Sequence, residues 1–267
     1  MFYKEVRNMG KTLRIIAWVS VLSLVFLGSS ALGQQRDWNC FEASWLIGNL
    51  VHPPPGRNVE LGQISNLVID ESNGRIALII LSDVPAFGAQ HVAIPFGSLA
   101  RDFRISVPPS IQAPPYMRQP NPYEKLMAVG VVPPVIDSTW VASVYKQYER
   151  TAYWTEKGEG PLMGFYRSDR LMGAKVQSPQ GAAVGEADDL MIDPDGRIVF
   201  MILANNAGKV AVPFALLSRK GENTFVLNAD PAKLASAPRF NRYEDTRNPE
   251  YATNVYEYFG VHPYWTR

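Results

Sequence analysis

One segment of the sequence occurs twice, about 120 residues apart, and this internal repeat limits what the chain can fold into. The first copy reads LGQISNLVIDESNGRIALIILSD, followed by HVAIPF. The second copy reads VGEADDLMIDPDGRIVFMILAN, followed by KVAVPF. Because self-similarity at a fixed spacing marks a repeated structural unit, both copies are predicted to fold alike.

Each copy is predicted to form short antiparallel β-strands joined by tight turns. Residues 66–69 and 75–81 are rich in Ile, Val and Leu, which favour strands. The turns between the strands contain Gly74 in one copy and Pro194-Asp195-Gly196 in the other. Glycine supplies a positive φ in such turns. We therefore predict two hairpins, with Asp70 and Asp193 accepting backbone hydrogen bonds where each turn begins.

A third strand in each copy is predicted to end in a proline. These strands cover residues 91–95 and 209–213 and end at Pro95 and Pro213. Proline cannot donate to a strand ladder, so the pairing is expected to stop there or lie at an edge. Four further glycines stand at strand starts, where a small sheet bends to close on itself: Gly48, Gly62, Gly173 and Gly185.

The order of these motifs resembles a known family. The series L-I-G, L-G-x-I-x-x-L-V-I-D, G-R-I and V-A-I-P-F resembles the PRC-barrel, over roughly residues 43–107 and 170–226. That module is the cytoplasmic domain of the photosynthetic reaction-centre H subunit and the C-terminal domain of the ribosome maturation factor RimM. The resemblance implies a non-catalytic β-barrel that binds other macromolecules, and it supplies no catalytic residues.

The predicted fold is mainly β, with two small PRC-type β-barrels in tandem, short helical appendages and a linker rich in proline and aromatic residues. The parts are a signal peptide (1–33), a first barrel with its appendage (43–116), a linker (117–167), a second barrel with its appendage (168–240) and an aromatic-rich tail (241–267). The appendages end in Ala-Pro-x-aromatic at residues 113–116 and 237–240, and the second is predicted to contain a short helix capped by Asp230.

The N-terminus has the pattern of an export signal. Basic residues precede an apolar stretch at 15–27, and small residues follow, with a cleavage site between Gly33 and Gln34. The prediction is an exported, periplasmic or cell-envelope protein. The alternative is an uncleaved segment that anchors the chain, the only membrane contact we expect.

Two aromatic segments are candidates for packing or for recognition. Residues 138–154 have helical spacing and include Trp140, Tyr145 and Tyr148, whereas the tail includes Tyr256, Tyr258 and Trp265. We predict that the helix packs between the domains and that the tail folds back on a barrel. A partner-binding surface is the alternative for both segments.

The sequence contains no constellation typical of catalysis. Asp188, Asp189, Asp193 and Asp195 lack the spacing of a calcium loop, and the three histidines form no zinc pattern. Cys40, the one cysteine, allows no internal disulfide, and the net charge of +1 does not favour nucleic acid. We expect no cofactor, no metal and no enzyme activity.

The predicted function is a non-catalytic binding or scaffold protein of the cell envelope that contacts an unknown protein partner through its barrels. The alternative is a binder of a small molecule or ion, or an enzyme, with its site between the two barrels. A deep polar pocket with convergent ionisable groups would favour the alternative, whereas an aromatic, hydrophobic patch would favour the protein partner.

Overall fold

The structure is a computed structural model that describes residues 38–54, 60–85, 87–106, 127–156, 160 and 162–266. The predicted signal peptide, the appendage at 113–116, and residues 117–126, 157–159 and 161 of the predicted linker lie outside the described residues. We refer to residues 38–156 as the first half and to residues 160–266 as the second half. Within the part of the chain that is described, no helix combines the length and apolar character needed to cross a membrane.

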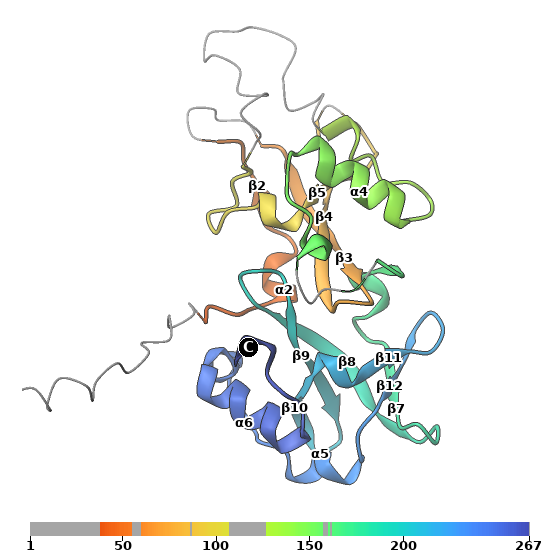
Figure 1. Cartoon of the computed structure of the whole chain (residues 1–267), viewed down its shortest axis with the longest axis vertical. Helices are drawn as coiled ribbons and strands as arrows, with labels where there is room; N and C mark the ends of the chain where they lie inside the picture. The colour runs from red at the N-terminus through yellow and green to blue at the C-terminus, as the bar shows by residue number, and fades with distance from the viewer. Residues whose placement is uncertain are drawn as a thin grey trace, which may run out of the picture. The chain divides into compact units, whose positions relative to one another are not determined.

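The first half contributes four strands to a five-stranded sheet (Figure 1). Their order is β2-β3-β4-β5, and neighbouring strands are antiparallel. The strands are β2 (Leu50–Val51), β3 (Gly62–Asp70), β4 (Arg75–Ser82) and β5 (Val92–Pro95). The predicted hairpin and the third strand ending at Pro95 are confirmed.

The second half forms most of a seven-stranded sheet with the order β10-β9-β8-β7-β12-β11. All of these neighbours are antiparallel except β7 and β12. The strands are β7 (Lys175–Gln177), β8 (Ala183–Ile192), β9 (Ile198–Asn205), β10 (Gly208–Pro213), β11 (Leu217–Arg219) and β12 (Thr224–Leu227).

Both sheets curl because their long hairpins carry bulges at matching places. The β3–β4 register shifts between Ile64 and Asn66 and again between Val68 and Ile69. The β8–β9 register shifts between Ala187 and Asp189 and again between Met191 and Ile192. Bulges bend a strand and increase its twist. The result is a mainly β fold with two curled half-barrel sheets, consistent with two small barrels, so the predicted fold class is confirmed.

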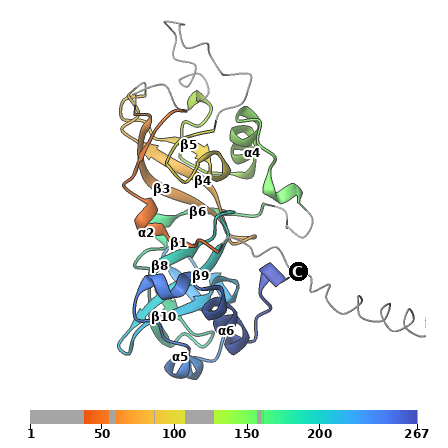
Figure 2. The same ribbon diagram turned by 90° about the vertical axis from the view of Figure 1, so that its left-hand side faces the viewer.

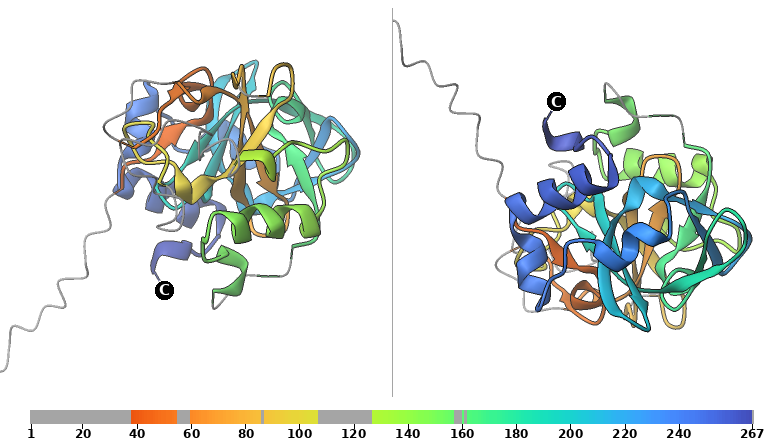
Figure 3. Two further views of the ribbon diagram at one scale, coloured as in Figure 1. Left: turned by 90° about the horizontal axis from the view of Figure 1, so that it is seen from above. Right: turned by 90° about the horizontal axis from the view of Figure 1, so that it is seen from below.

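Each sheet is covered by one helix, as Figure 3 shows in views along the long axis. Helix α4 (Ser138–Gln147) contacts β5, and α6 (Pro249–Phe259) contacts β10. Asp137 caps the first helix and Asn248 the second, each accepting a backbone N–H through its side chain. The prediction of one helix over 138–154 was too long: α4 ends at Gln147, and residues 153–155 form the separate 3-10 turn η3 (Tyr153–Thr155).

The tail folds back on the second sheet through α6 and ends in a similar turn, η7 (Tyr264–Thr266). Before it, the short helix α5 (Ala232–Ser236) begins one residue later than a cap at Asp230 predicts. The carboxylate of Asp230 nevertheless accepts the N–H of Ala232 at 2.9 Å.

Each half also gives one short strand to the sheet of the other half. Strand β1 (Phe41–Glu42) opens the first half but pairs with β8, and β6 (Phe165–Arg167) opens the second half but pairs with β3 (Figure 2). After each strand the chain returns to its own sheet, where Gly48 N–H donates to Ile64 and Gly173 N–H donates to Ala187. The halves are therefore joined by a reciprocal exchange of strands. Strand β6 lies inside the segment that the sequence predicted as linker.

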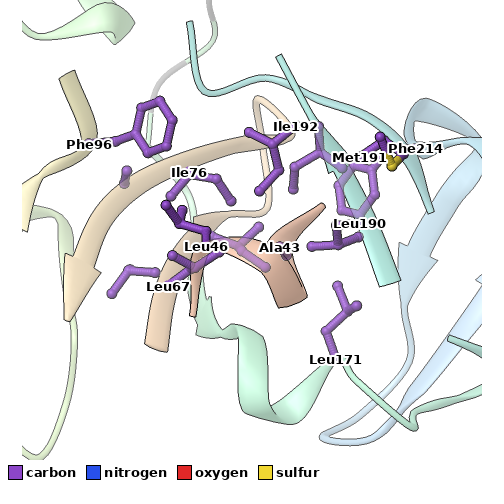
Figure 4. Close-up of a cluster of buried hydrophobic side chains, with 14 of the residues drawn as sticks. Ala43, Leu46, Leu67, Ile76, Phe96, Leu171, Leu190, Met191, Ile192 and Phe214 are labelled. Carbon is purple, nitrogen blue, oxygen red and sulfur yellow. The ribbon is translucent and has the colours of Figure 1, made fainter. Parts of the chain in front are cut away.

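The hydrophobic core is continuous across the exchange. Helix α2 (Ala43–Leu46), which follows β1, places Leu46 beside Leu67 of the first sheet and Ala43 toward Leu190 of the second (Figure 4). All four side chains are buried. Since burial of apolar area is the main stabilising contribution, this shared core holds the two sheets together.

Candidate binding site

The two hairpin turns meet at the centre of the molecule. Arg75 and Arg197 form an isolated antiparallel bridge. The N–H of Ile76 donates to Gly196 O, and the N–H of Ile198 donates to Gly74 O, both at 2.8 Å. Phe214 packs on Gly74 and Phe96 packs on Gly196, so each glycine contacts the aromatic ring that follows the third strand of the other half.

Asp70 organises the first turn and is completely buried. Its carboxylate accepts the N–H of Ser72 at 2.9 Å, the side-chain amide of Asn73 at 2.7 Å and the phenol of Tyr153 at 2.8 Å. Burial, and then the charge of Asp70, raise the pKa of Tyr153, so the phenol remains a donor. The guanidinium of Arg75 lies 4.9 Å from the centre of the Tyr153 ring.

Asp193 has the same surroundings in the second turn. Its carboxylate accepts the N–H groups of Asp195 and Arg197 at 2.9 and 2.8 Å, and the phenol of Tyr264 at 2.7 Å. Burial, and then Asp193, raise the pKa of Tyr264, and the guanidinium of Arg197 lies 4.9 Å from its ring centre. Both repeated aspartates thus bind turn amides and a phenol, which is a structural arrangement.

Two further acids of the second hairpin, Asp189 and Asp188, bind other partners. Asp189 is buried and accepts hydrogen bonds from Ser44 and from the N–H of Leu190. Burial raises the pKa of its carboxyl above the ordinary value. Asp188 pairs with Lys209 at 2.6 Å and accepts the phenol of Tyr243. Among the described residues, no group of three or more His, Cys, Asp or Glu could hold a metal ion.

The other residues that the sequence singled out lie at strand ends and turns. Gly62 and Pro95 bound the strands of the first sheet, Pro213 ends β10 and Gly185 lies near the start of β8. Gly48 and Gly173 lie in the turns before β2 and β7. None of them lines a pocket described below, and they shape the backbone.

The aromatic candidates of the two helices are mostly inside the protein. Tyr145 and Tyr256 are buried and donate to the carbonyls of Ala77 and Val199, at 3.0 and 2.9 Å. Tyr148 is also buried, and its hydroxyl has no hydrogen-bond partner among the described residues. These three side chains fasten the helices to the sheets and present little surface to a partner.

The remaining three candidates are partly buried. Trp140 donates to Val129 O at 3.3 Å, and Tyr258 donates to Lys233 O at 2.8 Å. Trp265 packs against Trp38 and Tyr256, with ring centres 4.4 and 4.7 Å apart. Each therefore has a packing role within the chain.

An aromatic pocket of about 390 Å³ lies where the exchanged arm of the first half passes between the sheets. We call it the arm pocket. It is lined by Asn39, Cys40, Phe41, Trp45, Leu46, Phe96, Leu99, Ala100, Arg101, Phe103, Pro194 and Arg247. These residues come from segment 39–46, which includes β1 and α2, from the segment after β5, from the second turn and from η6 (Tyr243–Arg247).

The rings of the arm pocket form one connected series. Phe41 lies 6.4 Å from Phe96, in a stacked orientation, and 5.9 Å from Trp45. Trp45 in turn lies 5.3 Å from Phe103. Trp45 is 51% exposed, which is unusual for so large an apolar side chain. Exposed aromatic side chains next to a pocket are typical anchors for binding.

Trp45, Phe103 and Arg101 line the pocket but are not among the residues predicted from the sequence. A signal for Trp45 was present: it directly precedes Leu46-Ile47-Gly48, whereas Arg170 precedes the corresponding Leu171-Met172-Gly173. The same repeat position therefore holds a tryptophan in the first copy and an arginine in the second. The two copies differ there in charge and in apolar surface. The pocket itself depends on contacts between distant segments.

Comparison with known proteins identifies part of this architecture. Residues 163–234 match the PRC-barrel domain family. None of the curated proteins compared with the chain gives a significant match. The matched segment begins two residues before β6, so the strand that opens the domain is the one that pairs with the other sheet. The chain contains a PRC-barrel domain at residues 163–234.

Proposed function

We propose that the chain is a non-catalytic binding or scaffold protein of the cell envelope, with two PRC-barrel domains in tandem, and that it holds a protein partner in the arm pocket. The arm pocket is the observation that carries the proposal. It combines connected aromatic rings with a half-exposed tryptophan, and such anchors dominate the energetics of protein interfaces.

The structure of the first sheet favours the presence of a second PRC-barrel domain. Its hairpin strands, bulges and turn aspartate correspond to those of residues 163–234, the segment that matches the family. Export is supported by the basic and apolar pattern of residues 1–33. Mass measurement of the mature chain and cell fractionation test export: a chain beginning near Gln34 in the envelope fraction is expected.

A non-catalytic role is supported by the hydrogen bonds that the buried aspartates accept. Asp70 and Asp193 each accept two turn hydrogen bonds and a phenol, and Asp189 binds Ser44. These contacts fix the carboxylates inside the fold, where they stabilise turns and the exchanged arm.

Affinity capture with three forms of the full chain tests the binding role. The baits are the wild type, Trp45→Ala and the control Leu50→Ala, which removes a 41% exposed side chain outside the arm pocket. We expect the same partner from envelope extract with the wild type and the control, and its loss with Trp45→Ala. Absence of any Trp45-dependent partner under several extraction conditions contradicts the proposal.

A small-molecule site is the second candidate, and the volume of the arm pocket favours it. About 390 Å³ lies at the lower end of the range of ligand pockets, roughly 300–1,000 Å³. The lining is aromatic, with two arginines as its charged groups. A flat aromatic compound is therefore the kind of ligand to test.

A further inference from the structure

A phenylalanine occupies the same position in the two halves, Phe103 in the first and Phe225 in the second. The N–H of His52, the residue after β2, donates to Phe103 O at 2.8 Å, and the chain there pairs in parallel with the segment that carries Phe103. Strand β12, which carries Phe225, pairs in parallel with β7. Strands β2 and β7 correspond, because each pairs with the repeated glycine of its long hairpin, Gly62 or Gly185.

In the second half this phenylalanine covers the exchanged strand. Phe225 packs edge-on against Tyr166 of β6, with ring centres 5.8 Å apart. The guanidinium of Arg219 lies 5.5 Å from the centre of the same tyrosine ring. Tyr166 is only 7% exposed beneath these neighbours. The second half therefore fills the space over its exchanged strand with its own side chains.

The first half has a shorter hairpin at this place. Phe103 follows Phe96 by seven residues, whereas Phe225 follows Phe214 by eleven. A tight turn replaces the longer tip, and in it the N–H of Phe103 donates to Ala100 O at 3.0 Å. Phe103 has a φ of 57°, in the left-handed region that a bulky residue rarely adopts. Because the backbone of the two phenylalanines differs, their rings reach different neighbours.

The different position of the ring leaves the exchanged strand of the first half open. Phe103 packs on Trp45, with ring centres 5.3 Å apart. Phe41 of β1 is the equivalent of Tyr166, since the two pair with equivalent isoleucines of β8 and β3. Phe41 is only partly buried, and it lines the arm pocket. The pocket thus lies over Phe41 where the second half has the ring of Phe225.

The lining of the arm pocket favours an uncharged aromatic group. Arg247 is paired with Glu42 at 2.6 Å, and Arg101 also has an interaction within the chain. The rings of the lining are the groups that meet a ligand there. Aromatic pairs prefer edge-on or offset arrangements, and they contribute to binding beyond the area that they bury. A ring that enters the pocket can therefore meet Phe41 edge-on.

We propose that the arm pocket receives one uncharged aromatic side chain from an extended segment of the protein partner. The ring lies edge-on over Phe41, in the place that Phe225 takes over Tyr166, with Trp45 beside it. The partner thus completes the first half as the longer hairpin completes the second. This inference rests on the proposed function and specifies which kind of side chain the partner inserts.

Selection from a random peptide library displayed on phage, with the full chain as target, tests the proposal. Two variants form a matched pair, because Ala100 and Ser218 are both exposed and follow Phe96 and Phe214 by four residues. Ala100 lines the arm pocket, whereas Ser218 does not. Ala100→Trp should fill the pocket from within, and Ser218→Trp adds the same side chain outside it. Thermal unfolding of each variant confirms that it is folded.

We expect peptides selected with the wild type and with Ser218→Trp to share one aromatic residue, and to be lost with Ala100→Trp and with Trp45→Ala. Synthetic peptides then give affinities by fluorescence anisotropy, and the wild type and Ser218→Trp are expected to agree within about twofold. Replacing the shared aromatic residue by Ala is expected to weaken binding at least about tenfold, as for a buried anchor. Replacing it by cyclohexylalanine, which keeps the size and removes the π-system, is expected to weaken binding about two- to tenfold.

Each other outcome overturns a defined part. Peptides that are lost with Trp45→Ala but share only aliphatic residues, or that bind equally well with cyclohexylalanine, overturn the recognition of a ring and leave the binding function in place. Competition by free N-acetylphenylalaninamide at concentrations similar to those of the peptides overturns a peptide site in favour of a small aromatic ligand. Absence of peptides that are lost with Trp45→Ala and Ala100→Trp overturns the inference and counts against the proposed function as well.

Discussion

Phe96 packs directly on Gly196, and a β-carbon on that glycine would lie 2.8 Å from the Phe96 ring. The contact joins the segment after β5 in the first half to the turn between β8 and β9 in the second. Gly196 has a φ of 85°, where a side chain is strained. One residue therefore meets two requirements, a left-handed turn and close contact between the halves.

Gly196→Ala is expected to lower the free energy of unfolding by about 2–4 kcal/mol, because left-handed strain adds to overpacking against Phe96. Gly173→Ala is the matched control. Gly173 has a φ of 76° but has open space around its β-carbon position, so about 1–2 kcal/mol of strain is expected there. Urea unfolding measures both, and equal losses would show that the contact with Phe96 is unimportant.

Tyr153→Phe and Tyr264→Phe are each expected to destabilise the fold by about 1–3 kcal/mol, since each removes a donor from a buried aspartate. Tyr148→Phe is the control: its buried hydroxyl has no partner among the described residues, and the corresponding residue of α6 is Phe259. We expect the control to be as stable as the wild type or more so. Thermal unfolding distinguishes the three, and a loss at Tyr148 would contradict this assignment.

Asp189→Asn is expected to stabilise the protein at neutral pH. Asn66 occupies the corresponding place in the first sheet: it also follows a bulge, and it accepts the hydroxyl of Ser168 as Asp189 accepts that of Ser44. Burial raises the pKa of Asp189 in the folded chain, so the folded state holds the proton more tightly than the unfolded state. The stability that protonated Asp189 contributes is therefore fully present below the unfolded pKa, and it is lost as the pH rises through the folded pKa.

The gain from Asp189→Asn should accordingly shrink as the solution is acidified. Asn66→Asp is the reverse test, and it should destabilise at neutral pH and less so in acid. Unfolding by urea across the acidic to neutral range measures both effects. A gain from Asp189→Asn that grows toward acid would contradict the direction of the pKa shift.

Cleavage between the halves should leave them associated. A protease site inserted between Glu156 and Gly160 lets the folded full chain be cut in place. Because β1 is paired with β8 and β6 with β3, both fragments are expected to elute together and to separate only in denaturant. Gel filtration of cut and uncut chain checks this, and separate elution without denaturant would rule out a stable exchange.

Much of the local structure could be predicted from the sequence. Alternating and branched apolar residues predict β3, β4, β9 and β10, and the glycine of each turn marks where the hairpins reverse. The two covering helices, α4 and α6, are harder to predict from the sequence. The pattern V-Y-x7-Y-W-T occurs at residues 144–155 and 255–266, and it identifies α4 with η3 and α6 with η7 as equivalent units. The sequence-based prediction places the first copy in a linker and the second in a tail, and so it separates these two equivalent units.

The sequence by itself determined the hairpins, the turns and the repetition of both, because these depend on residues close together in the chain. Only the tertiary structure decided which sheet β1 and β6 join. The two sheets offer nearly the same edges, so either pairing satisfies the local pattern, and long-range packing of α2 across both sheets selects the exchange. The arm pocket follows from that choice, since Phe41 of the crossed arm lines it together with Phe96, Pro194 and Arg247.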